Sequence, residues 1–211
     1  MLHFTLSTFS RGDYCEKGSK FYAFAIPAIG EDDIKRAQKY LKDTYPDARH
    51  ICTAYRIMVG EQIKEFAGDD GEPRGSAGTP ILNVLKRQKL VNSAIFVVRY
   101  FGATKLGIPG LINSYSTAAA DSIKDVKLKS WVQLERFTIC YHYEKQNKVE
   151  SVLRKFKVNI INSEFGENIE SALEVEVDKV ADLSKELIEI SHGTIKVIQA
   201  SYFDKGTLIK E

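Results

Sequence analysis

Hydrophobic and polar positions follow two different periods along the chain. Residues 19–28 are rich in aromatic and branched side chains, a composition typical of a strand. From Glu31 onward apolar residues recur at helical spacing, acidic residues fill the first turn, and Pro46 lies just beyond the end. The pattern therefore predicts a strand followed by an amphipathic helix that packs one face on a sheet.

The chain up to residue 130 continues this alternation of strands and helices. Three further strands are expected, at residues 49–59, 62–67 and 94–101. Gly60-Glu61 is the expected hairpin turn between the first two of them. One helix is expected to begin with Thr79 as N-cap and Pro80 at its first position, and another to cover residues 111–123.

Residues 131–211 show a second succession of elements. Strands are expected at residues 134–143, 158–165, 171–178 and 194–203, and helices at 144–156 and 179–191. This β-α-β-β-α-β order is typical of a ferredoxin-like domain, an antiparallel sheet with two helices on one face. Because the run 124–130 is polar, we place a boundary there and expect an α+β protein with domains 1–130 and 131–211.

Composition and charge narrow the function classes. The 211 residues are 44% hydrophobic, enough for a core, and 30 basic against 28 acidic residues leave a net charge of +2. Any nucleic-acid contact must therefore come from a local basic patch. Cys15, Cys52 and Cys140 are too widely spaced for a redox or zinc motif. Because the sequence also shows no signal peptide or apolar span, we expect a cytoplasmic protein without membrane contact.

Glycine and proline are concentrated beside charged residues in two stretches, 69–80 and 98–111. Such clusters usually fix an unusual backbone path that carries function. We predict that the two stretches meet in space and that Arg99 lies within ion-pair range of Asp70 or Glu72. The candidate binding residues are His50, Asp70, Glu72, Gly75, Ser76, Gly78, Thr79, Arg99, Tyr100, Gly102, Lys105, Gly107 and Gly110.

Both stretches offer contacts for a phosphate group. Residues 75–80 lead into a helix start, where free amides and the helix dipole favour an anion, although a capped helix with a tight turn explains them equally well. Residues 102–107 have the strand, G-x-x-x-x-G, helix layout of a phosphate-binding loop, with Lys105 inside it. They are not a Walker motif, because Ile108-Pro109 stands where Lys-Ser/Thr is required.

The acidic and aromatic candidates have alternative roles. The carboxylates within 69–72 could ligate a hard cation or supply a general base. We favour a solvated Asp-Gly turn whose acids pair with Arg74 or Arg99. Tyr100 could stack on an unpaired base or simply end a core strand, and His50 is expected to pack rather than to bind a metal. We expect no catalytic residue, no metal site and no cofactor.

The two stretches together resemble the IMPACT/YigZ family, whose members carry D-D-G-E-P-x-G-S/T-A-G-x-P followed by R-Y-F-G-G-x-x-L-G-x-G-G-L. The matching residues are Asp70-Gly71-Glu72-Pro73, Gly75-Ser76-Ala77-Gly78 and Pro80, then Arg99-Tyr100-Phe101-Gly102, Leu106-Gly107 and Gly110-Leu111. Ala103 and Pro109 depart from the pattern, because the family has glycine at both positions. Both residues restrict the backbone, and Pro109 also removes an amide donor.

The resemblance implies a fold and a function. It implies that the first domain has the fold of the second domain of a small-subunit ribosomal protein, shared with elongation factor G domain IV. The second domain is then similar to elongation factor G domain V. The resemblance also implies a non-enzymatic regulator or RNA-associated factor of translation, with RNA, the ribosome or a protein of translation control as partner. The alternative is a hydrolase or nucleotide-binding enzyme that uses the acidic and glycine-rich loops. An open basic surface favours the first function, and a closed pocket of convergent charges favours the second.

Overall fold

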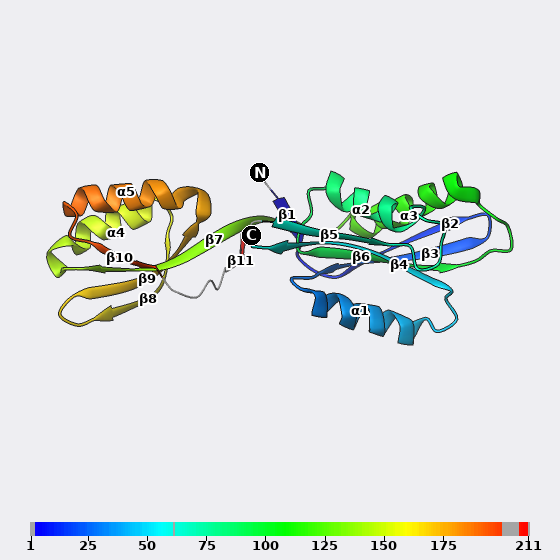
Figure 1. Ribbon diagram of the computed structural model, residues 1–211, viewed down its shortest axis with the longest axis horizontal. Coiled ribbons are helices and arrows are strands. Elements are labelled where there is room, and N and C mark those ends of the chain that lie inside the picture. The colour runs from blue at the N-terminus through cyan, green and yellow to red at the C-terminus, as the bar shows by residue number, and fades with distance from the viewer. Residues whose placement is uncertain (1–2, 61, 200–206, 211) are drawn as a thin grey trace. The chain divides into compact units, whose positions relative to one another are not determined.

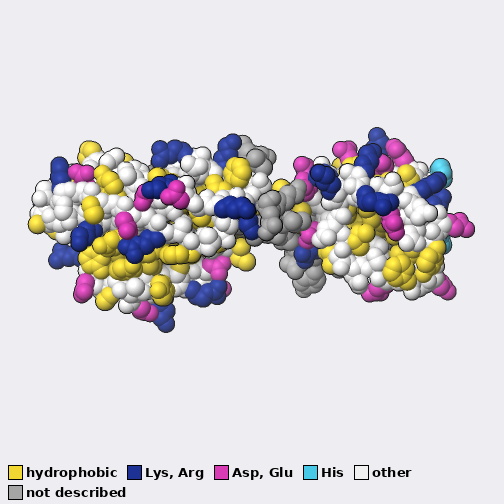
Figure 2. Space-filling model, turned by 180° about the vertical axis from the view of Figure 1, so that it is seen from behind, with side chains coloured by type: hydrophobic (Ala, Val, Ile, Leu, Met, Phe, Trp, Pro, Cys, Tyr) yellow, Lys and Arg dark blue, Asp and Glu magenta, His cyan; other side chains and the backbone are white. Residues whose placement is uncertain are grey.

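The computed structural model describes residues 3–60, 62–199 and 207–210 (Figure 1; space-filling view in Figure 2). It contains two compact units, Met1–Trp131 with Lys210–Glu211 and Val132–Ile209. The described residues form an α+β structure with two antiparallel sheets and five α-helices. None of these helices is long and apolar enough to cross a membrane.

A five-stranded antiparallel sheet forms the centre of the first unit. Its strands, in spatial order, are β2 (Ser10–Glu16), β3 (Ser19–Pro27), β6 (Ser93–Tyr100), β4 (His50–Val59) and β5 (Gln62–Gly68). The predicted strands at 19–28, 49–59, 62–67 and 94–101 are thus confirmed. Val59 pairs with Gln62, which confirms the hairpin, although Glu61 of its turn lies outside the described residues.

Helices cover both faces of this sheet. Helix α1 (Glu31–Thr44), which confirms the predicted helix, lies on one face, and α2 (Gly78–Arg87) and α3 (Gly107–Ile123) lie on the other (Figure 1). Side chains alternate along a strand, so β6 contributes Ile95 and Val97 to the core under α2 and α3, and Phe96 and Val98 to the core under α1. By the same alternation Arg99 falls on the α2–α3 face and Tyr100 on the α1 face.

The structure corrects three expectations for the first unit. Thr79 is not the N-cap of α2: the helix begins at Gly78, and its N-cap, Ala77, has no side-chain cap. Helix α3 begins at Gly107, four residues before the predicted start. Strands β1 (His3–Leu6) and β2 were not expected, and β1 pairs with residues 128–131 at the start of β7 (Leu128–Tyr141). The polar run in which we place the domain boundary therefore already contains the beginning of a strand.

The second unit has the predicted β-α-β-β-α-β order. After β7 come α4 (Gln146–Lys155), β8 (Asn159–Phe165), β9 (Ile169–Glu176), α5 (Val180–Ser191) and β10 (Lys196–Gln199). The strands lie in the order β10-β7-β9-β8, and α4 and α5 cover the same face (Figure 1). The last predicted strand continues to 203, but residues 200–203 lie outside the described part. A short strand, β11 (Thr207–Lys210), also pairs with β7.

Candidate functional site

Asp69 organises the first glycine-rich stretch. Its carboxylate accepts hydrogen bonds from the backbone N–H groups of Gly75 (2.8 Å), Ala77 (3.1 Å) and Gly78 (2.8 Å). Burial alone would raise the pKa of this carboxyl, but the three donors and the Arg74 charge outweigh it and hold the pKa below its ordinary value. The helix start therefore already carries an anion of the chain itself, and the amides of Gly75 and Gly78 are not free for an external phosphate.

A tight turn connects β5 to this loop. Asp70 (φ 43°) and Gly71 (φ 87°) both have left-handed backbones, and the Glu72 N–H donates to the Asp69 carbonyl over 3.0 Å. These features define an Asp-Gly turn, as predicted. The Asp70 carboxylate accepts the Ile51 N–H at 2.7 Å, and His50 Nδ1 lies 2.7 Å from the Asp70 carbonyl oxygen. Two predicted site residues, His50 and Asp70, are thus brought together, but Asp70 does not pair with Arg99.

Glu72 and Arg99 join the two stretches. The Arg99 Nη1 group donates to Glu72 Oε1 at 2.5 Å, which confirms that the stretches meet and that Arg99 has an acidic partner in the first of them. The side chains are only 7% and 4% exposed, so the pair is buried rather than solvated. Tyr115 of α3 also donates its hydroxyl to Glu72 Oε1 at 2.8 Å. A buried carboxylate with two donors holds the loop against β6 and α3.

Aromatic rings and a thiol complete this buried cluster. The Arg99 guanidinium lies 5.5 Å from the ring centroid of the buried Phe21 and 5.5 Å from that of Phe101, which is 51% exposed and covers the cluster from outside. Among the described residues its Nε finds no hydrogen-bond partner. Burial raises the pKa of the Cys52 thiol, and the neighbouring Glu72 charge acts in the same direction. Burial also raises the pKa of the Tyr115 hydroxyl, so both groups stay protonated over the physiological range.

The second glycine-rich stretch is shaped by a close backbone approach. A Cβ on Gly102 would lie 1.9 Å from the carbonyl carbon of Gly18, so only glycine fits there, and the Gly102 N–H donates to Ser19 Oγ at 3.1 Å. Ala103 has a left-handed backbone (φ 64°), which normally favours glycine. Pro109 lies in the first turn of α3, where its missing N–H has no intrahelical partner to lose.

The other candidate residues lie in different environments. Ser76 is buried and donates to the Pro73 carbonyl at 2.6 Å. Tyr100 packs edge-on against Tyr22 on the α1 face, so the sheet separates it from Arg99. Lys105 is exposed in the loop before α3, Gly107 (φ 69°) begins that helix, and Gly110 follows in its first turn.

Two predicted residues line an open groove instead of the buried cluster. Gly75 and Thr79 border a hollow of about 510 Å³ between α2 and α3, together with Lys86 and Arg87. The predicted single site thus divides into a buried cluster around Glu72 and Arg99 and this exposed surface, which we call the α2–α3 groove. No group of three or more metal-ligating side chains occurs in the described ranges.

Three residues in or beside the buried cluster were not among the sequence candidates. Asp69 was assigned only to an acidic cluster, although an acid just before a glycine-rich helix start is a common partner for backbone amides. Tyr115 counted only as an apolar position of a helix, yet a buried tyrosine hydroxyl normally needs a partner. For Cys52, whose thiol lies 3.0 Å from the Asp69 carbonyl oxygen, the sequence carries no signal.

Fold and site together define a two-unit α+β protein in which an acidic, glycine-rich loop forms an ion pair with a buried arginine. The family model of the Impact N-terminal domain matches residues 17–123 of the sequence, and the family model of a domain of unknown function (DUF1949) matches residues 141–194. The chain belongs to the IMPACT family, in the two-domain form of its bacterial members.

Curated relatives extend over both units. IMPACT family member YvyE of Bacillus subtilis is 29% identical over 98% of this chain and 96% of its own length. IMPACT family member YigZ of Escherichia coli is 27% identical over 86% of this chain and 90% of its own length. A crystal structure of a hypothetical protein matches with a TM-score of 0.64 and 25% identity, covering 95% of this chain and 98% of that one.

Proposed function

We propose that this protein is a non-enzymatic RNA- or ribosome-associated factor linked to translation. The observation that carries the proposal is that two carboxylates of the acidic loop hold the fold together. Asp69 is bonded to three amides, and Glu72 is buried against Arg99 and Tyr115. A general base needs a carboxylate in reach of a substrate proton, and these two are already engaged. The third carboxylate of the loop, Asp70, is exposed and accepts the Ile51 N–H.

The α2–α3 groove supports RNA as the partner. Thr79, Asn83 and Arg87 recur at four-residue spacing along α2, so they share one face of the helix, and all three are exposed. This row spans about 12 Å at 1.5 Å per residue. Lys86, at the same end of α2, forms an ion pair with Glu65, in which Nζ and Oε2 are 2.6 Å apart. Hydroxyl, amide and guanidinium donors in a row suit the phosphates and sugars of a nucleic-acid backbone.

Fold relationships support the same assignment by analogy. We infer that the first unit is related to the second domain of a small-subunit ribosomal protein and to elongation factor G domain IV. The second unit, with its β10-β7-β9-β8 strand order, is then ferredoxin-like and similar to elongation factor G domain V. Related folds can host unrelated functions, so the groove, rather than the fold, is the feature to test.

RNA binding measured against salt tests the proposal. Fluorescence polarisation with a labelled single-stranded RNA should show weak binding that falls steeply with salt, because phosphate contacts release counterions. Arg87→Ala and Lys105→Ala should each reduce the salt slope by about one. Arg36→Ala is the matched control, since Arg36 is exposed on α1 at the other face of the sheet. A wild-type protein that binds no RNA, or equal effects of all three variants, would contradict the proposal.

A further inference from the structure

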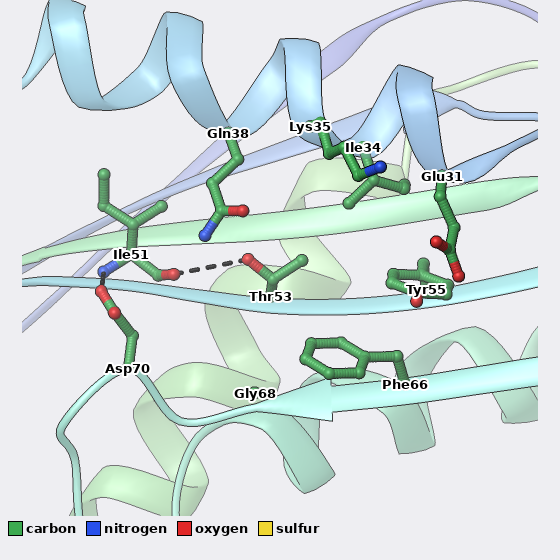
Figure 3. A pocket seen from close by; sticks show the side chains of 10 residues that line it. All are labelled: Glu31, Ile34, Lys35, Gln38, Ile51, Thr53, Tyr55, Phe66, Gly68 and Asp70. Carbon is green, nitrogen blue, oxygen red and sulfur yellow. Dashed lines mark hydrogen bonds between the residues drawn. The ribbon is translucent and has the colours of Figure 1, made fainter.

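A second hollow, of about 310 Å³, lies between α1 and the β4–β5 hairpin (Figure 3). We call it the α1 cavity. Its size falls within the range of small-molecule sites. Ile34 and Ile51 provide buried apolar surface, and Figure 3 shows Gln38 and Asp70 at the same end of the cavity. The lining thus combines an apolar body with a few polar groups.

Two stacked aromatic rings form one wall of the cavity. The rings of Tyr55 and Phe66 are stacked, with centroids 5.1 Å apart and an interplanar angle of 14°. Phe66 is 45% exposed, so part of its ring remains available for contact. Its position depends on Gly68, where a Cβ would lie 2.9 Å from the Phe66 ring. Figure 3 shows the ring extending toward Gly68 and beneath Thr53.

Hydrogen-bonding groups gather at the end near Asp70. One Asp70 oxygen accepts the Ile51 N–H, and the described residues engage this carboxylate in no other side-chain hydrogen bond. Carboxylate oxygens have further lone pairs, so the exposed group can still accept from a ligand. The Gln38 amide points from α1 toward β4 (Figure 3) and can donate as well as accept.

The charges of the lining leave Asp70 as the carboxylate available to a ligand. Glu31 is already paired with Lys64, and Lys35 with Asp32 at 3.5 Å, whereas the Asp70 carboxylate has no ion-pair partner among the described residues. A group with hydrogen-bond donors is therefore favoured at this end of the cavity, and a phosphate beside Asp70 would be repelled. A planar ring with N–H donors on one edge suits the stacked wall and the carboxylate together.

We propose that the α1 cavity binds a guanine base. Guanine has two adjacent donors, N1–H and the exocyclic amino group, which can share the Asp70 carboxylate. Its O6 can accept from the Gln38 amide while the ring stacks on Phe66. Adenine turns the acceptor N1 toward the carboxylate, so it fits less well. The base belongs either to a free nucleoside or to single-stranded RNA. The inference is independent of the proposed function, because guanosine alone can occupy the cavity whether or not the α2–α3 groove holds RNA.

Calorimetric titration with nucleosides tests this site on the full chain. Guanosine should bind saturably, and inosine, which lacks the amino group, at least several-fold more weakly; adenosine and uridine should not compete. Asp70→Asn should weaken guanosine binding about tenfold or more. Asparagine keeps an acceptor for the Ile51 N–H and tolerates the left-handed backbone at this position, so the fold should persist. Asp43→Asn makes the same chemical change at an exposed α1 residue outside the cavity and should leave binding unchanged.

Competition then distinguishes the two sources of the base. A uridine-rich RNA with one guanine that displaces guanosine assigns the cavity to RNA, and a failure to displace it assigns the cavity to the free nucleoside. Equal binding of all four nucleosides, no saturable binding of guanosine at millimolar concentration, or an unaffected Asp70→Asn variant would overturn the proposal. None of these results bears on the salt-dependent RNA binding of the α2–α3 groove.

Discussion

The Arg99 guanidinium donates to the Glu72 carboxylate across 27 positions of sequence, and the contact joins the two glycine-rich stretches. Both side chains are buried, so the pair fixes the position of the loop rather than presenting charge to a ligand. Residues of a family's sequence motif can thus form a structural ion pair inside the fold. The surfaces that remain for binding, the α2–α3 groove and the α1 cavity, lie on either side of the sheet and are bordered by the outer residues of the same loop, such as Gly75 and Asp70.

Loss of Arg99 should strongly destabilise the first unit. Arg99→Ala leaves the buried Glu72 carboxylate without its cationic partner, which costs about 3 to 5 kcal/mol in comparable pairs. Scanning calorimetry of the full chain should show a lower melting temperature for one transition. The matched control is Arg11→Ala, because the Arg11–Asp13 pair is about half-exposed and surface pairs contribute about 0 to 1 kcal/mol. Equal melting temperatures for both variants would show that the Arg99 pair does not stabilise the fold.

Asp69 should make stability fall in acid. Its pKa is lower in the folded chain than in the unfolded one, so its contribution is complete above the ordinary value of about 4 and is lost as the pH falls through the folded value. Asp69→Asn should reduce stability at neutral pH and flatten the decline that begins as the pH falls below about 4. Urea unfolding at several pH values measures both effects. An unchanged acid profile in the variant would assign the decline to other carboxyl groups.

Much of the fold could be predicted because its periodicity is local. Helix α1 has its acidic first turn and apolar stripe within fourteen residues, and the second unit repeats the two periods in a recognisable order. Strand β2 was missed because it is an edge strand whose exposed positions are polar, as in Arg11 and Asp13. Strand β1 depends on pairing with residues 128–131, and such a distant partner leaves no mark on a four-residue segment.

The ion pair of the site could be predicted because a charged side chain near the core requires a partner of opposite charge. An arginine near a core strand and acids in a glycine-rich turn indicated the ion pair before its geometry was known. The cap of α2 was not predictable in the same way, because Asp69 reaches the Gly78 amide from nine positions upstream, whereas the local pattern favoured Thr79. The division into a buried cluster and two surface hollows depends on the alternation of β4 and β6 across the sheet, which only the assembled structure shows.

Alkaline pH should destabilise the first unit through Cys52 and Tyr115. Burial raises the pKa of both groups, so the folded chain keeps them protonated while the unfolded chain releases protons above about 8.5 for the thiol and 10 for the phenol. Their contribution is therefore complete below these values and is lost as the pH rises. Cys52→Ala should flatten the decline between about pH 8.5 and 10 in urea unfolding. Cys15→Ala, at an exposed thiol, should keep the wild-type profile, and a steep decline in both variants would exclude Cys52 as the cause.

Adjacent substitutions at Gly102 and Ala103 should have opposite effects. Gly102→Ala places a Cβ 1.9 Å from the Gly18 carbonyl carbon, and because backbone must move to admit it, the loss should reach about 1 to 3 kcal/mol or more. Ala103→Gly removes the strain of a left-handed alanine backbone, which should stabilise the fold by about 1 to 2 kcal/mol. Glycine also gives the unfolded chain more conformational freedom, which should destabilise the fold by about 0.4 to 1 kcal/mol. The second variant should therefore melt at the wild-type temperature or slightly above it. If Ala103→Gly proved clearly destabilising, the alanine methyl group would have to make a stabilising contact that exceeds its backbone strain.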